Sequence, residues 1–312
     1  MTIVDASKKL LPVYAVRPLF QAFSILVVFL AGSSLLLAQD DDEIRIDSSV
    51  VVVNASIKTA DGRNASGLKR EQFKIFEDGV EQKVEYFSAE QTPFAAVILL
   101  DTSGSMEERV GMARAAAIRF LDGLRDSDSA AIYRFDSKIE LVQAFSNSRD
   151  IAEAAFDLKA DGMTKMNDAI YQAAVDLSKR DEKRRAIIVL SDGQDTMSSR
   201  SADKALKAAM SADIAIYTID MSPVGDAKRV QNQGALKNLA EKSGGTFVST
   251  PGGAAMRDAF EKIVDDLGVQ YTLGYSPLNT KKDGKWRAIE LRVAKPNLTI
   301  RTRKGYNAEK GK

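Results

Sequence analysis

The sequence predicts an α/β protein with a doubly wound, mostly parallel sheet, helices on both faces of that sheet, and a small β module built from the N- and C-terminal flanks. Two observations predict this architecture. Between residues 94 and 267, short apolar runs alternate with segments of helical periodicity. Residues 44–92 and 268–306 instead hold strand-like runs separated by turn signals. The chain has 312 residues, 45% of them hydrophobic, which is enough to bury a sizeable core.

The N-terminal segment, residues 1–39, indicates export. Basic residues up to Arg17 precede an uncharged, mostly apolar stretch, 18–39, and an acidic run, 40–43, follows it. This order is typical of a signal peptide or an N-terminal membrane anchor, and the stretch has about the length that spans a bilayer. Residues 31–33 resemble a cleavage site, yet more apolar residues follow them, so both alternatives remain open. We expect the rest of the chain to be exported, either periplasmic, at the cell surface, or anchored to the cytoplasmic membrane and facing out.

The two flanks are expected to form one β module. Their strands are read at 50–57, 73–76 and 82–87, and at 269–275, 286–293 and 298–303. Neither group can bury an apolar face alone, because two or three isolated strands are marginal in water. Right-handed crossovers bring the start of the first central strand and the end of the last helix to the same sheet edge, so the flanks leave as neighbours. The aromatic residues expected in the core of the module are Phe73, Phe76, Tyr86, Phe87, Tyr271, Tyr275 and Trp286.

The central region, 94–267, supplies the elements of the parallel sheet. Strands are expected at 95–100, 130–135, 186–190, 214–219 and 246–248. A short turn after residue 135 suggests a further edge strand, 139–144, paired antiparallel with the strand before it. Helices are expected at 107–124, 151–158, 167–179, 202–210, 235–242 and 254–267.

The composition excludes several classes of site. The chain has no His and no Cys, so it cannot form a Ser-His-Asp or Cys-His triad, a His-ligated zinc site, an iron–sulfur cluster or a disulfide. Any metal must be held by oxygen, which favours Mg²⁺, Mn²⁺ or Ca²⁺. Because the formal net charge is only +1, no global field attracts nucleic acid, and we expect no nucleic-acid partner.

The strongest chemical signal follows the first central strand. Asp101, Ser103 and Ser105 carry oxygen at every second position of a turn that precedes a helix. The carboxyl ends of parallel strands are where such sheets bind ligands, and this spacing can turn one carboxylate and two hydroxyls toward a small cation. The alternative is purely structural, with Ser105 capping the helix and Asp101 closing the turn.

Two further segments bring oxygen to the same sheet edge. Thr164 precedes an expected helix, and Asp192 follows the strand 186–190. Asp136 and Asp195 are candidates for a second layer of carboxylates around the metal, although capping of turns explains them as well.

With these residues in view, the chain resembles a von Willebrand factor type A domain that carries a metal-ion-dependent adhesion site. The pattern Asp-x-Ser-x-Ser falls on Asp101, Ser103 and Ser105, the Thr of the second loop on Thr164, and the Asp of an Asp-Gly pair on Asp192. Asp168-Ala169 downstream of Thr164 also fits. In the family the two Ser and the Thr tend to contact the metal, and the two Asp often act through water. The resemblance implies that Mg²⁺ bound there accepts an acidic side chain of a partner protein.

The resemblance covers about residues 94 to 267 and departs from the family in one loop. Asp161 and Met163 stand where glycines are commoner, which leaves the geometry around Thr164 open. The flanks also resemble those of exported bacterial proteins that carry a related type A domain.

Enzyme interpretations fit less well. A phosphatase of the haloacid-dehalogenase type would need a second Asp where Ser103 stands, and we find neither a Gly-x-Ser-x-Gly elbow nor a phosphate-binding Gly-x-x-x-x-Gly-Lys loop. The sequence therefore predicts a metal-dependent, adhesion-type binding module that is not an enzyme. The alternatives are a metal-dependent hydrolase and an envelope scaffold with a structural metal site.

Overall fold

A computed structural model describes residues 50–223, 229–249 and 254–311 of the chain. Its central sheet has six strands in the order β10-β9-β8-β5-β6-β7. The strands are β5 (Phe94–Asp101), β6 (Ser129–Phe135), β7 (Ile139–Ser146), β8 (Arg184–Ser191), β9 (Ile214–Asp220) and β10 (Phe247–Ser249). Neighbours pair in parallel except β6 and β7, which are antiparallel. The predicted sheet and its antiparallel edge strand are confirmed.

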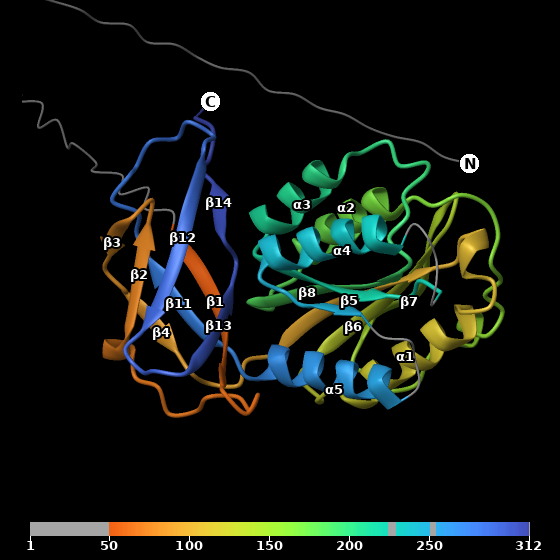
Figure 1. The fold of residues 1–312 in the computed structure, drawn as a ribbon, viewed down its shortest axis with the longest axis horizontal. Coiled ribbons are helices and arrows are strands. Elements are labelled where there is room, and N and C mark those ends of the chain that lie inside the picture. Colours follow the sequence, from red (N-terminus) through yellow and green to blue (C-terminus); the bar gives the residue numbers. More distant parts are fainter. Residues whose placement is uncertain (1–49, 224–228, 250–253, 312) are drawn as a thin grey trace, which may run out of the picture. The chain divides into compact units, whose positions relative to one another are not determined.

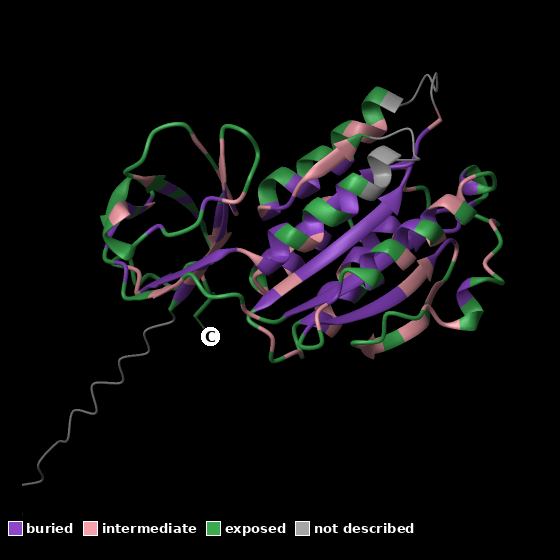
Figure 2. Cartoon of the chain, turned by 90° about the horizontal axis from the view of Figure 1, so that it is seen from below, coloured by how far each residue is buried: buried purple, intermediate pink, exposed green. Residues whose placement is uncertain are grey.

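Helices cover both faces of this sheet, as Figure 1 shows. One face carries α2 (Met166–Leu177), α3 (Ala202–Ser211) and α4 (Arg229–Ser243), and the other carries α1 (Val110–Asp122) and α5 (Ala254–Gly268). All eight residues of β5 are buried, because a central parallel strand is covered from both sides. Figure 2 shows the same pattern, with buried central strands and helices that are exposed only on their outer surfaces.

Three expected helices differ from the structure, and the one expected at 235–242 begins earlier, at Arg229 of α4. Only a 3₁₀ turn, Glu153–Ala155, forms within 151–158. A helix of this length is marginal without a buried face, and Ala155 is the one fully buried residue of that segment. The helix expected from residue 107 begins at Val110, because a 3₁₀ turn, Gly104–Met106, first carries the chain away from the sheet edge.

The flanks pair with each other in two antiparallel four-stranded sheets, β13-β1-β11-β4 and β14-β12-β2-β3. The N-terminal strands are β1 (Val51–Thr59), β2 (Phe73–Glu77), β3 (Val80–Gln82) and β4 (Tyr86–Ser88). The C-terminal strands are β11 (Tyr271–Tyr275), β12 (Trp286–Val293), β13 (Leu298–Thr302) and β14 (Gly305–Asn307). Each sheet mixes strands of both flanks, and residues of both flanks share one apolar core. The predicted β module is confirmed.

The aromatic core expected for this module was partly wrong. Phe73, Tyr271 and Tyr275 are buried and Phe87 packs against them. Tyr86 and Trp286 are 44% and 43% exposed, and Phe76 is only half-buried. The period of two along each strand explains the difference, since β12 turns Ile289 and Leu291 inward and leaves Trp286 outside.

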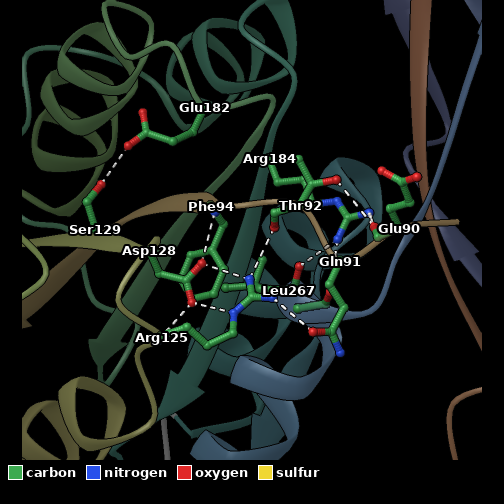
Figure 3. Close-up of polar contacts among 11 residues, drawn as sticks. Glu90, Gln91, Thr92, Phe94, Arg125, Asp128, Ser129, Glu182, Arg184 and Leu267 are labelled. Atoms are coloured by element: carbon green, nitrogen blue, oxygen red, sulfur yellow. Dashed lines mark hydrogen bonds and ion pairs between the residues drawn. The ribbon is translucent and has the colours of Figure 1, made fainter. Parts of the chain in front are cut away.

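Arg184, at the start of β8, holds the two connections between the central sheet and the β module (Figure 3). Its Nη1 donates to the carbonyl oxygens of Leu267 and Gly268 at 3.3 and 3.0 Å. Its Nη2 donates to those of Glu90 and Gln270 at 2.9 and 2.5 Å. The start of the first central strand and the end of the last helix therefore lie at one sheet edge, as predicted.

The predicted signal peptide or membrane anchor, residues 1–39, lies outside the described residues. Within the described ranges, no helix has both the length and the apolar character needed to cross a bilayer.

Candidate metal centre

Three loops meet at the edge of the central sheet where β5, β6 and β8 have their carboxyl ends: the loop after β5, the loop before α2 and the loop after β8. Two of these loops, the one after β5 and the one before α2, are joined by backbone hydrogen bonds. The amide of Gly104 donates to the Gly162 carbonyl at 3.1 Å, and the amide of Asp161 donates to the Thr102 carbonyl at 2.9 Å. The loops that carry the predicted site are thus neighbours in space, although about 60 residues separate them in the chain.

Asp101, Ser103 and Ser105 lie together in the first loop. The Ser103 hydroxyl donates to Asp101 Oδ1 at 2.6 Å and is hydrogen-bonded to the Ser105 hydroxyl at 3.2 Å. The Ser103 amide also donates to Asp101 Oδ1, at 2.9 Å, so Asp101 closes the turn as the structural alternative expected. Ser105 does not cap the helix: it is exposed, and α1 begins only at Val110 without a side-chain cap. The alternate spacing therefore does bring the three oxygens to one place.

Asp101 is buried next to a second acidic residue. Burial raises the pKa of its carboxyl to about 6, hydrogen bonds from Ser103 and Ser191 oppose this shift, and the charge of Asp192 adds to it. Ser191 Oγ donates to Asp101 Oδ2 at 2.5 Å, which ties the end of β8 to the end of β5. Asp192 is 1% exposed, and its Oδ1 accepts from the amide of Gln194 at 3.0 Å.

Thr164 is held in the second loop by the loop that follows β8. Its amide donates to Thr196 Oγ1 at 2.9 Å, and its carbonyl accepts from the amides of Thr196 and Met197 at 3.0 and 2.9 Å. Thr164 is buried. Among the described residues, its hydroxyl has no hydrogen bond to the other four candidate ligands. The glycine that remains in this loop, Gly162, adopts a φ of +74°, a conformation that residues with a Cβ rarely adopt.

Asp136 and Asp195 both make the turn contacts that the structural alternative expected. Asp136 Oδ1 accepts from the amide of Lys138 at 2.8 Å, and Asp195 Oδ1 accepts from the amide of Ser198 at 3.0 Å. Asp195 Oδ2 also accepts from the amide of Asn167 at 2.7 Å, which joins the start of α2 to the loop after β8.

The donor set fits a hard cation. Two buried carboxylates, Asp101 and Asp192, repel each other, and within the described ranges neither forms an ion pair with a Lys or Arg. Hydroxyls supply the remaining oxygens, from Ser103, Ser105 and Thr164. No group of three or more carboxylates suited to a metal occurs among the described residues, so a cation here would depend on these hydroxyls.

Two residues that support the site were not singled out from the sequence. Ser191 precedes Asp192 at the end of a buried strand, and this position at the sheet edge was a usable signal. Thr196 had no signal of its own, because its role depends on which loop lies against it.

Solved structures with a similar fold include three with low sequence identity. BatB, a conserved hypothetical protein from Bacteroides thetaiotaomicron, is 19% identical, with 56% of this chain and 98% of that chain covered at a TM-score of 0.45. The vWF domain of the type V pili tip protein Mfa5 from Porphyromonas gingivalis is 15% identical, and the match covers 57% of this chain and 95% of that chain at a TM-score of 0.48. A von Willebrand factor type A structure from Catenulispora acidiphila is 16% identical, and the match covers 84% of this chain and 74% of that chain at a TM-score of 0.45.

Comparison with curated protein sequences gave no match. The sequence model of the von Willebrand factor type A domain family matches residues 96–263, which begin in β5 and end in α5. This match spans more than half of the 312 residues, and its bounds enclose all five candidate ligands. The chain therefore belongs to the von Willebrand factor type A domain family.

Proposed function

We propose that this protein is a metal-dependent, adhesion-type binding module that holds Mg²⁺ at Asp101, Ser103, Ser105, Thr164 and Asp192. Through the ion it would bind an acidic side chain of a partner protein. The observation that carries the proposal is the buried pair of carboxylates, Asp101 and Asp192. Hydroxyl groups lie beside this pair, and no Lys or Arg among the described residues forms an ion pair with it. A type A domain is consistent with a protein-interaction module rather than an enzyme.

The neutral hydroxyl ligands explain why the ion would accept a partner's carboxylate. A bound Mg²⁺ supplies an electrophilic centre with a strong preference for oxygen. Since Ser103, Ser105 and Thr164 would neutralise none of its charge, the site would retain attraction for one more carboxylate. Mn²⁺ and Ca²⁺ prefer the same donor atoms, and a competition titration ranks the three ions.

The surface beside Thr164 supports a protein partner. Met163 and Met197 are 50% and 46% exposed. Met163 directly precedes Thr164 in the chain, and the amide of Met197 donates to the Thr164 carbonyl. Methionine side chains adapt to varied apolar surfaces, so they can pack against residues that flank the partner's acid. Metal-bound carboxylate and apolar contact together would define the binding face.

The N-terminal sequence supports export of this module. We propose that the described domain acts outside the cytoplasmic membrane, and that the membrane is a second partner where the N-terminal segment is retained. A reporter that is active only outside the cytoplasm, fused to the C-terminus of the full chain, tests this topology. A fusion that is active only inside the cell would contradict it.

Capture of a partner from an envelope extract separates the three candidate functions. If the protein is a metal-dependent binding module, it should retain a partner in the presence of Mg²⁺ and release it when a chelator is added. The double variant Ser103→Ala with Ser105→Ala should not capture that partner. Ser178→Ala, at the opposite end of α2, is the matched control and should retain it. A partner that persists in chelator would favour the scaffold, and turnover of a captured substrate would favour the hydrolase.

A further inference from the structure

A small cavity lies at the sheet edge opposite the candidate metal centre, and three arginines line it. Its volume is about 30 Å³, and Arg185, Arg301, Arg303 and Asp213 are among its lining residues. Arg185 comes from the start of β8, Arg301 from β13, and Arg303 follows β13. The cavity therefore lies between the central sheet and the β module, both of which belong to the compact unit 47–312.

Each of these arginines has one buried donor without a partner. The Nε atoms of Arg185, Arg301 and Arg303 are buried and make no hydrogen bond with any residue that the structure describes. The side chain of Arg303 is only 10% exposed. Three of the five unpartnered arginine Nε donors among the described residues thus belong to residues that line this one cavity, and an unmade hydrogen bond on a buried charged group is costly.

Most of the other donors of the three guanidinium groups are occupied by described residues, which leaves two Nη N–H groups on Arg185 and one each on Arg301 and Arg303. Arg185 donates to the carbonyls of Ala212 and Arg180 at 3.1 and 2.7 Å and has no carboxylate partner within the described ranges. Arg303 pairs with Asp213 and also donates to two carbonyl oxygens. Arg301 pairs with Asp266 and also donates to two hydroxyls.

The charges around the cavity leave an excess of positive charge. Of the described residues, Asp213 is the one carboxylate that lines it, against three arginines. Burial raises the pKa of Asp213, while Arg303 and Arg185 act in the opposite direction. Asp266, outside the lining, pairs with Lys58 at 2.8 Å as well as with Arg301. The acidic residues nearby therefore do not neutralise the three guanidinium groups.

We propose that this cavity binds one small monovalent anion of the size of chloride. A water molecule needs about 10–15 Å³ of such space, so the cavity of about 30 Å³ admits two or three water-sized particles and is too small for an extended organic acid. One water accepts at most two N–H donors and must place two hydrogens of its own. A halide accepts several donors without directional limits, carries the opposite charge, and so satisfies this lining better than water does.

Bromide tests the site directly because it replaces chloride and gives an anomalous signal. Crystals of the protein soaked in bromide are expected to show an anomalous peak within the cavity, near the three arginines. In solution, the midpoint of thermal unfolding should rise with each tenfold increase in chloride when sodium gluconate keeps the ionic strength constant. An empty or water-filled cavity in bromide, with equal midpoints in chloride and gluconate, would overturn the proposal.

A variant of Arg185 links the solution effect to this cavity. Arg185→Gln removes one positive charge and one Nε donor without separating a carboxylate from its partner. It should abolish the dependence of the midpoint on chloride, whereas Arg119→Gln, at an exposed site on α1, should preserve it. Chloride dependence that is unchanged in Arg185→Gln would place the anion elsewhere. If this variant does not fold, the bromide peak in the unaltered protein decides the question.

Discussion

Replacing Arg184 by methionine tests how the β module is joined to the central sheet. Arg184 is 1% exposed, and its side chain donates to four carbonyl oxygens: one in the connection before β5, two at the end of α5 and one just after α5. Methionine keeps much of the aliphatic stem but supplies no donor. The substitution therefore leaves buried carbonyl groups without their partner while changing little of the packing.

The expected loss of stability follows from these contacts. Nη1 and Nη2 carry two N–H groups each, so we count four charge-assisted hydrogen bonds, which at the lower value of about 1.5 kcal/mol each give about 6 kcal/mol. Burial of the guanidinium lowers the pKa of Arg184 to about 10, and this burial cost offsets part of the gain. We therefore expect Arg184→Met to reduce the free energy of unfolding by about 3 kcal/mol. For a unit of this size the thermal midpoint should fall by roughly 6–12 °C.

The assay is thermal unfolding of the full chain, combined with limited proteolysis of the two connections. The connections around Glu90 and Gly268 should be cleaved faster in Arg184→Met, because their carbonyls lose their common donor. Arg119→Met is the control: Arg119 is 53% exposed and pairs with Asp122 at 3.6 Å, so its loss should cost less than about 1 kcal/mol. Equal midpoints and equal cleavage rates for Arg184→Met and the unaltered protein would refute this account of the connections.

Three further predictions concern the candidate metal centre and are measured by calorimetric titration with Mg²⁺. In Gly162→Ala, the new Cβ would lie 2.4 Å from Ser137 Oγ, on a residue whose φ is +74°. The resulting strain of about 1–2 kcal/mol should weaken Mg²⁺ binding roughly tenfold, and an unchanged affinity for Mg²⁺ would contradict this. Thr196→Val removes the acceptor of the Thr164 amide and should weaken Mg²⁺ binding by roughly ten- to a hundredfold, whereas Thr196→Ser should restore it. A Thr196→Val protein that binds Mg²⁺ as tightly as the unaltered protein would contradict this role of Thr196. Because burial raises the pKa of Asp101 from 3.8 to about 6, the metal-free carboxyl favours the folded state at pH below 3.8 and loses that contribution as the pH rises through 6. Protons should therefore compete with Mg²⁺ below about pH 6, and equal affinity at roughly pH 5 and pH 7.5 would exclude this competition.

The fold could be predicted where a strand is buried on both faces, or where two flanking segments can bury their apolar faces only by pairing with each other. β5 is apolar up to Asp101 and β8 is apolar over 186–190, as is typical of strands in a covered parallel sheet. The expected core of the β module was wrong for Trp286 and Tyr86, because being aromatic does not decide which side of a strand a residue occupies. The alternation of neighbouring residues along β12 carries that information.

The candidate site could be predicted as far as its spacing within one loop and its place at a sheet edge. The grouping of Asp101, Ser103 and Ser105 depends on positions two residues apart, which a single turn determines. The support from Thr196 and the carbonyl contacts of Arg184 depend on segments that are distant in the sequence. Neither residue type carries a local pattern that reveals such partners, so only the structure brings them to light.

Calorimetric titration of Mg²⁺ into the unaltered protein and into Ser103→Ala with Ser105→Ala tests the central claim most directly. The account predicts binding by the unaltered protein, a loss of more than roughly 100-fold in the double variant, and unchanged binding in Ser178→Ala. Circular dichroism should show the same folded content in all three proteins, because the two hydroxyls lie at the sheet edge and outside the apolar core. Equal Mg²⁺ affinity in the double variant and the unaltered protein would contradict the assignment of the site.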